Sequence, residues 1–145
     1  MKVYRITLAK WSSELIASGF PARWNSKGSF VIYTAGSVSL ACLENIVHRS
    51  GEGLNQSFKV ITIEIPSKVK ISTIEVDNLT KIDLYSQTQQ LGDKWIKEQK
   101  TAVLKVKSSI ISKEFNYLIN PNHLDFQLIK LIGIEDFTFD PRIKK

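Results

Sequence analysis

Hydrophobic and polar residues alternate in several short stretches of this chain rather than in long helical repeats. Residues 58–65 are the clearest case, because Ile61, Ile63 and Ile65 fall on one side of an extended segment that ends before Pro66. Similar patterns predict further strands over 2–8, 30–33, 71–76, 101–106, 117–119, 126–132 and 137–139. Many short strands without regularly interleaved helices favour an α+β domain over a doubly wound parallel sheet.

Three segments have helical patterning instead. Residues 12–18 predict a short helix that begins at Ser12 or Ser13. Residues 86–99 predict a second helix with Leu91, Trp95 and Ile96 as its core contacts, and Gly92 is a candidate break within it. Residues 37–48 predict a third, for which Ser37 or Ser39 is the N-cap. Residues 50–56 contain two glycines and are predicted to be a loop, since they lack a complete dinucleotide fingerprint.

Glu44 has an unusual place in the third predicted helix. On a helical wheel Leu40, Leu43 and Val47 form the centre of the apolar arc, and Glu44 falls directly beside Leu40. The polar side is expected around Asn45 and residue 49. We therefore expect Glu44 to be at least half buried, where an unpaired carboxylate is costly. It is either a functional group or a rim residue neutralised by a lysine or an arginine.

Three other candidate residues precede this helix, and one follows it. Arg23 lies in a polar loop, RWNSKG, and Tyr33 ends the β-branched and aromatic run FVIY. Arg5 lies on the first predicted strand, and Ser108 follows the strand over 101–106. The residues alone leave ordinary roles open: Tyr33 as a core aromatic, Ser108 as a turn residue and Arg23 as an ion-pair partner of Glu44.

The length and composition suit one globular domain, residues 1–145, with a real core, because 43% of the 145 residues are hydrophobic. The start of the chain lacks the apolar segment of a signal peptide, and no apolar run is long enough to span a bilayer. A single cysteine, Cys42, fits a reducing cytoplasm and is predicted to pack within the helix. One cysteine and two distant histidines, His48 and His123, do not make a zinc site by themselves, so no metal is expected.

A formal net charge of +6 suits an anionic partner: a phosphorylated small molecule, nucleic acid or an acidic protein. The lysines are scattered, and no basic helix with interleaved aromatic residues is present. A dedicated nucleic-acid reader is therefore weakly supported, and no direct contact with nucleic acid is expected.

Several enzyme classes lack their motifs here. The chain has no GxxxxGK[ST] loop, no GxSxG nucleophile elbow and no HExxH pair. An ordinary glycosidase needs two carboxylates, and only Glu44 lies on an apolar helix face. What remains is one carboxylate, an arginine and a tyrosine on separate elements.

Five segments, in order along nearly the whole chain, resemble the RES-domain toxins of bacterial toxin–antitoxin pairs. The first is RWN, followed by a strand ending in tyrosine and a helix of the form sLAxLE with a histidine after it. The others are GDKW (92–95), residues 106–108, NYLINPNH (116–123) and FTFDPR (137–142). The arginine, glutamate and serine of the family name correspond to Arg23, Glu44 and Ser108. One departure is Lys107, where the family usually has proline before the serine.

The resemblance implies a fold similar to that of ADP-ribosylating toxins, which is a split α+β sheet with short helices around a central NAD cleft. It implies Glu44 and Arg23 as catalytic residues, and Arg5, Arg23, Tyr33 and Ser108 as residues that bind NAD. NAD is then a substrate, and no cofactor is expected. The implied partner is a helix-turn-helix antitoxin of the Xre type, and inorganic phosphate is a candidate co-substrate.

The implied reaction is cleavage of the nicotinamide–ribose bond by hydrolysis or by phosphorolysis. Transfer of ADP-ribose to a protein is the alternative within the family. A non-catalytic basic module that binds nucleic acid or an acidic protein is the alternative outside it. The residues do not choose between the three acceptors, which are water, phosphate and a protein side chain.

Overall fold

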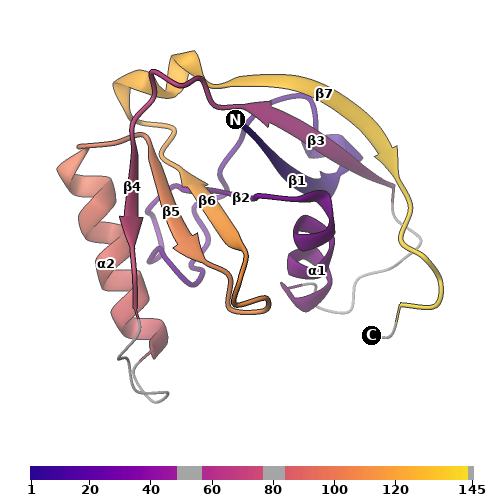
Figure 1. Ribbon diagram of the computed structural model, residues 1–145, viewed down its shortest axis with the longest axis horizontal. Coiled ribbons are helices and arrows are strands. Elements are labelled where there is room, and N and C mark those ends of the chain that lie inside the picture. Colours follow the sequence, from indigo (N-terminus) through magenta and orange to yellow (C-terminus); the bar gives the residue numbers. More distant parts are fainter. Residues whose placement is uncertain (49–56, 77–83, 144–145) are drawn as a thin grey trace.

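The computed structural model describes residues 1–48, 57–76 and 84–143, and in this part of the chain seven strands form one sheet (Figure 1). The predicted α+β class is confirmed. The sheet order is β4-β5-β6-β2-β1-β3-β7, and only β4 and β5 pair in parallel among these neighbours. The strands are β1 (Lys2–Leu8), β2 (Ile32–Ala35), β3 (Phe58–Glu64), β4 (Ile71–Ile74), β5 (Val103–Lys107), β6 (Phe115–Ile119) and β7 (Lys130–Phe137). The α-helices are α1 (Val38–His48) and α2 (Leu84–Glu98), with 3₁₀ turns η1 (Ala9–Trp11) and η2 (Leu124–Leu128).

The sheet is split between β1 and β2. These neighbouring strands pair at one position, Tyr4 opposite Ala35, whereas β1 and β3 pair from Lys2–Glu64 to Leu8–Phe58. Figure 1 shows the result, with β4, β5, β6 and β2 in one half and β1, β3 and β7 diverging from them in the other. The expected split-sheet fold is confirmed, and the opening leaves room for side chains from both halves.

Strand β3 anchors hydrophobic residues on both faces of its half of the sheet. Ile61, Ile63 and the following Ile65 are each at most 1% exposed and belong to one core cluster, as their alternation predicts. Phe58 and Val60 point to the other face, where they pack in a cluster with residues of α1. This second cluster fixes α1 against the β1 side of the split.

Helix α1 begins as predicted but faces the sheet differently. The Ser37 hydroxyl accepts a hydrogen bond of 3.1 Å from the Leu40 N–H and so caps the helix. The predicted apolar arc is wrong: Leu40 is fully buried, but Leu43 and Val47 are 37% and 58% exposed. The helix packs on β1 through Leu40 and Ala41, and Asn45 adds a polar contact, because its side-chain amide donates to the Ile6 carbonyl.

Helix α2 runs through Gly92 without a break, contrary to the candidate break. Gly92 faces the backbone of Trp24, and a Cβ at this position would overlap the Trp24 carbonyl. The glycine therefore allows α2 to lie directly on the 22–26 segment. Trp95 is buried, and Leu91 and Ile96 pack around the same cluster as Trp24, as predicted for the core contacts of this helix.

Two predicted elements are replaced by 3₁₀ turns. The helix expected over 12–18 is absent. The chain forms η1 just before this range, and the Ser12 hydroxyl closes η1 by donating to the Ala9 carbonyl. The strand expected over 126–132 is wrong in its first part. There His123 accepts a hydrogen bond from the Asp125 N–H and begins η2 before β7.

Strand ends also differ from the expected ranges. The strand of FVIY starts two residues later than predicted and runs to Ala35. The last predicted strand, 137–139, is only the end of β7, and Phe139 leaves it to pack edge-on against Phe58. The predicted loop over 50–56 lies outside the described residues. None of the described helices is both long and apolar enough to cross a membrane.

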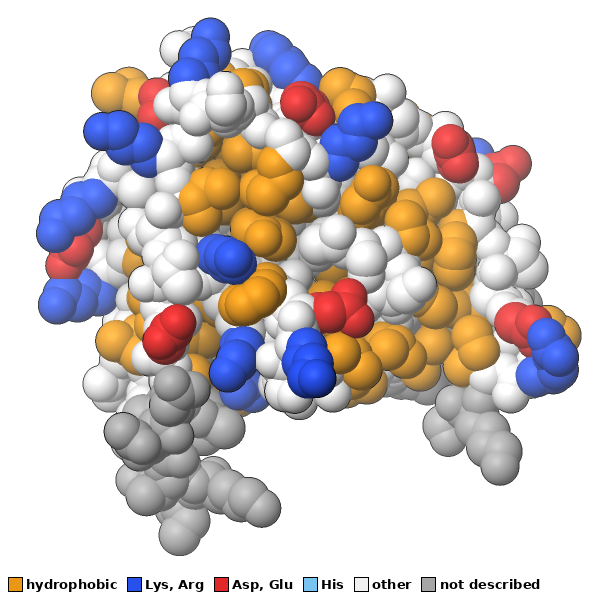
Figure 2. Space-filling view, in the orientation of Figure 1, with side chains coloured by type: hydrophobic (Ala, Val, Ile, Leu, Met, Phe, Trp, Pro, Cys, Tyr) orange, Lys and Arg blue, Asp and Glu red, His pale blue; other side chains and the backbone are white. Residues whose placement is uncertain are grey.

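A space-filling view shows how charged side chains are distributed over one face of the molecule. In Figure 2 the lysine and arginine side chains are spread mainly along the outline of this face, and hydrophobic side chains gather over its interior. Lys105 lies over the ring of Phe115, with its ammonium 4.1 Å from the ring centroid. On this face the positive charge does not form a single basic patch.

We predict that Gly92→Ala destabilises the fold, since the new methyl group forces α2 away from the Trp24 carbonyl. Overpacking of this kind costs about 1–3 kcal/mol. Thermal unfolding of the purified variant measures the loss. Gly133→Ala is the matched control, because a Cβ there meets Thr62 at an ordinary contact distance of 3.5 Å. Equal melting temperatures for the two variants would show that α2 does not need this close approach.

Candidate functional site

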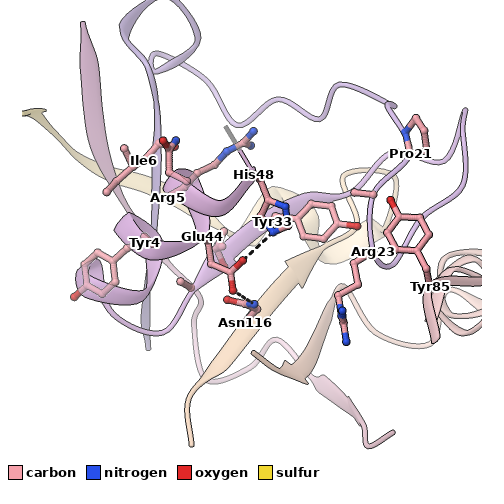
Figure 3. A pocket seen from close by; sticks show the side chains of 15 residues that line it. Tyr4, Arg5, Ile6, Pro21, Arg23, Tyr33, Glu44, His48, Tyr85 and Asn116 are labelled. Carbon is pink, nitrogen blue, oxygen red and sulfur yellow. Dashed lines mark hydrogen bonds and ion pairs between the residues drawn. The ribbon is translucent and has the colours of Figure 1, made fainter. Parts of the chain in front are cut away.

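A cavity of about 420 Å³ lies where the sheet opens between β1 and β2 (Figure 3). Four of the five residues predicted for the site line it, and they come from separate segments: Arg5 from β1, Arg23 from the following loop, Tyr33 from β2 and Glu44 from α1. The full lining is Tyr4, Arg5, Ile6, Pro21, Ala22, Arg23, Tyr33, Thr34, Ala35, Ala41, Glu44, Asn45, His48, Tyr85 and Asn116. Ser108 is the predicted residue that is not part of this lining.

Helix α1 presents one face to the cavity. Ala41, Glu44, Asn45 and His48 all line it, and their spacing of three and four residues places them on the same side of a helix. Small Ala41 leaves space beside the sheet, so that the longer side chains of Glu44, Asn45 and His48 can reach the cavity. The polar face of α1 is thus turned inward at this point, and Leu43 and Val47 are turned outward.

Glu44 is held by three hydrogen-bond donors from three parts of the chain. Its Oε1 accepts from the Asn116 amide at 2.9 Å and from the Ser108 hydroxyl at 3.1 Å. Its Oε2 lies 3.1 Å from His48 Nε2, which must donate because a carboxylate only accepts. Each oxygen has two lone pairs, so Oε2 keeps one position for a further donor. The side chain is 19% exposed, in agreement with the expected half-burial.

The pKa of Glu44 lies below its usual value. Burial by itself raises the pKa, but the hydrogen bonds from His48, Asn116 and Ser108 and the charge of His48 together outweigh burial. Glu44 is therefore ionised at neutral pH. For His48 the hydrogen bond to Glu44 has the largest effect and raises the pKa above 6.5, while burial and the charge of Arg23 oppose it.

Arg23 is positioned through its backbone by α2. The Thr88 hydroxyl donates to the Arg23 carbonyl, and the Gln89 amide donates to the carbonyls of Ala22 and Asn25 at 2.9 and 3.1 Å. Arg23 lines the cavity, and in Figure 3 its guanidinium points away from Glu44. Its Nε is buried and has no hydrogen-bond partner among the described residues. Within the described residues Glu44 forms its ion pair with His48 and not with Arg23.

Tyr33 holds the same loop from the opposite side. Its hydroxyl donates to Asn25 Oδ1 and accepts from the Trp24 N–H, which lies 3.1 Å away. Burial raises the pKa of Tyr33 well above its usual value, so the hydroxyl stays protonated. Since the hydroxyl is used by the loop, the ring is the part of Tyr33 that faces the cavity.

Arg5 and Ser108 approach the site in different ways. The Arg5 guanidinium donates to the Ile16 carbonyl at 3.0 Å, and burial lowers its pKa, although a guanidinium stays charged in any case. The Ser108 hydroxyl donates to Glu44 and accepts from the N–H groups of Ile110 and Ile111 at 3.0 and 3.1 Å. Its contacts are those of a residue that orients Glu44 rather than one that lines the cavity.

Sequence reasoning did not assign roles to several residues of this site. His48 had a usable signal, because it follows Glu44 by one helical turn. Asn116 on β6 is the first residue of the NYLINPNH segment, which marked this stretch without giving Asn116 a role. Asn45 on α1 and Tyr85 at the start of α2 had no signal, since only the folded chain brings them to the cavity. Within the described residues there is also no group of three or more His, Cys, Asp or Glu side chains that could hold a metal ion.

Comparison with known proteins covers almost the whole chain. The family model of the RES domain matches residues 2–140. The chain belongs to the RES family. Its match includes all five residues predicted for the site, Arg5, Arg23, Tyr33, Glu44 and Ser108.

Curated RES-like relatives are similar over most of their length. One from Sphingobium sp., named Prs ADP-ribosylating toxin, is 34% identical over 83% of this chain and 79% of its own. Two proteins named Toxin Res, from Yersinia enterocolitica and Photorhabdus laumondii, are each 32% identical. They cover 99% and 100% of this chain and 100% and 98% of their own lengths, respectively.

We predict a pH-dependent contribution of the Glu44–His48 pair to stability. The lowered pKa of Glu44 stabilises the fold above pH about 4.5, and this contribution is lost as the pH falls. The raised pKa of His48 stabilises it below pH about 6.5, and this contribution is lost as the pH rises through the raised value. The melting-temperature difference between the wild type and His48→Gln is therefore largest near pH 5–6 and small at pH 9. A difference that is constant over this range would contradict the pairing.

Proposed function

We propose that this chain is the toxin of a bacterial toxin–antitoxin pair and that it depletes NAD by cleaving the nicotinamide–ribose bond. The observation that carries the proposal is the ionised Glu44, which three donors fix beside a cavity that two arginines also line. The RES membership and the printed names of the relatives support it.

A single carboxylate suits this reaction. Nicotinamide is already cationic in NAD, so it leaves with the bonding electron pair and needs no proton from a general acid. The ribose becomes an oxocarbenium-like cation, which Glu44 faces with its negative charge. At 4 Å and an effective dielectric constant near 20, such a charge contributes about 4 kcal/mol, or roughly three powers of ten in rate. The open position on Oε2 suits a ribose hydroxyl.

The arginines supply a site for the diphosphate. A guanidinium is always charged and can hold two phosphate oxygens with its planar fork. Arg23 is the better placed of the two, since its backbone is fixed by α2 and its Nε has no hydrogen-bond partner among the residues that the structure describes. Arg5 lies on the β1 side of the same cavity. The ring of Tyr33 is available to stack on one of the two bases.

The acceptor of the ADP-ribose group defines a second candidate function. The name of the Sphingobium relative favours transfer to a protein, whereas water or phosphate gives free products. Incubation with NAD, with and without phosphate, distinguishes these outcomes. Nicotinamide release reports cleavage in every case. Free ADP-ribose indicates hydrolysis, ADP-ribose 1-phosphate indicates phosphorolysis, and an increase in protein mass indicates transfer to a protein. No release of nicotinamide under any condition would overturn the proposal and favour a binding module.

We predict that Glu44→Gln abolishes most of the turnover while the protein stays folded. The amide oxygen still accepts from Asn116 and Ser108, so the change removes mainly the charge. Turnover falls by about two to four powers of ten, and NAD binding changes far less. Glu135→Gln, an exposed position on β7, is the matched control. A folded Glu44→Gln protein with wild-type release of nicotinamide would exclude this mechanism.

We also predict that the cognate Xre-type antitoxin excludes NAD from the cavity by inserting a negatively charged element near Arg23 and Arg5. A carboxylate there imitates a phosphate of the substrate. Titration of NAD into the purified toxin–antitoxin complex measures this by calorimetry. Undiminished NAD binding at saturating antitoxin would mean that inhibition works from another surface.

A further inference from the structure

His48 lies on the cavity, and its role in the proposed bond cleavage so far is that of a donor to Glu44. Its ring lines the cavity, its Nε2 is 3.1 Å from Glu44 Oε2, and its side chain is 63% exposed, so that ligands and water can reach it. Figure 3 shows the contact as a dashed line from the Glu44 carboxylate to the imidazole. A helix-surface ion pair would place the two residues in the same way, but here both side chains face a cavity.

The contact with Glu44 decides which nitrogen of the neutral imidazole carries the proton. Oε2 of an ionised carboxylate accepts and does not donate, so Nε2 keeps its hydrogen. The lone pair of neutral His48 is then on Nδ1. Within the described part of the chain, Nδ1 accepts no hydrogen bond from another residue, and the His48 side chain lines the cavity and is 63% exposed.

We propose that His48 is the general base that activates water for attack on the ribose, with Glu44 as the group that orients its ring. The inference rests on the proposed cleavage of NAD. As the bond between C1′ and nicotinamide breaks, nicotinamide leaves with the electron pair. The water oxygen forms a bond to C1′, and Nδ1 takes one of its protons. His48 then releases this proton to solvent, so the products are nicotinamide, ADP-ribose and one proton.

The charged and titratable groups around His48 set the pH at which it can act. Glu44 on its own helix raises the pKa of His48 above 6.5. Arg23, from the loop before β2, lowers it, and burial lowers it too. The remaining titratable groups of the cavity are Arg5, Tyr4, Tyr33 and Tyr85. Because the base must be neutral, hydrolysis should rise with pH through the neutral range and reach a plateau above it.

The test compares the wild type with His48→Gln in phosphate-free buffer from pH 5.5 to 9, with nicotinamide release as the readout. Glutamine still donates to Glu44 but is not a base. We expect kcat to fall about 100-fold, KM to change little, and the dependence on pH in the neutral range to disappear. Azide needs no deprotonation, so adding it should restore nicotinamide release in His48→Gln and give a glycosyl azide detectable by mass.

Two controls make the result decisive. His123→Gln changes a histidine that contacts Gln99 and Asp125 away from the cavity, and it should keep the wild-type pH profile. The second control is His48→Ala with added imidazole. Neutral imidazole should raise the rate of this variant, and protonated imidazole should not. His48→Gln and His48→Ala should both keep a cooperative melting transition, since the His48 side chain is largely exposed.

The outcomes separate this inference from the proposed function. A wild type that releases no nicotinamide at any pH would overturn both. An active wild type together with a His48→Gln variant of the same rate and pH profile would overturn the role of His48 alone. A slow variant that neither azide nor imidazole rescues would show that His48 only positions Glu44, and it would equally overturn the role as base.

Discussion

The site depends on keeping one carboxylate ionised inside a partly closed cavity. Burial opposes this, because a charge loses its hydration. Glu44 overcomes it by accepting hydrogen bonds from Ser108, Asn116 and His48, which come from the end of β5, from β6 and from α1. Two of these bonds, from Ser108 and Asn116, join the helix to the other half of the split sheet, and the third lies within the helix. The network that sets the charge therefore also fixes where the halves of the fold meet.

The arginine side of the cavity is built on backbone contacts. Helix α2 reaches the 22–26 segment through Gly92, through Thr88 and Gln89, and through Asp93, whose carboxylate accepts from the Ser26 N–H at 3.1 Å. Tyr33 holds the segment from β2. A polar loop would otherwise be free to move, and fixing its backbone lowers the entropy cost of presenting Arg23 to a ligand. Residues far from the chemistry are thus part of the site.

The same geometry connects the proposed reaction with its proposed base. Glu44 has two oxygens with different surroundings: Oε1 is occupied by two structural donors, and Oε2 contacts His48 and keeps an open position. One carboxylate can in this way face the substrate and orient an imidazole at the same time. In the proposed reaction, this one carboxylate then serves both as the electrostatic group and as the group that orients the base.

The sequence alone determined the strands with strong alternation and the core contacts of α2, and it predicted Arg5, Arg23, Tyr33, Glu44 and Ser108 as site residues, because each of these has a local pattern or a family motif. It left the N-cap of α1 open between Ser37 and Ser39, and the structure selects Ser37. It did not determine which side of α1 faces the sheet. Leu43 and Val47 are apolar and yet exposed, because the helix packs on the sheet through Leu40 and Ala41, with Asn45 donating to the Ile6 carbonyl on β1. Nor did it determine that the Tyr33 hydroxyl holds the loop, or that Asn116 holds Glu44. Such contacts join residues far apart in the chain, and only the closing of the split sheet around the cavity brings their atoms within hydrogen-bonding distance.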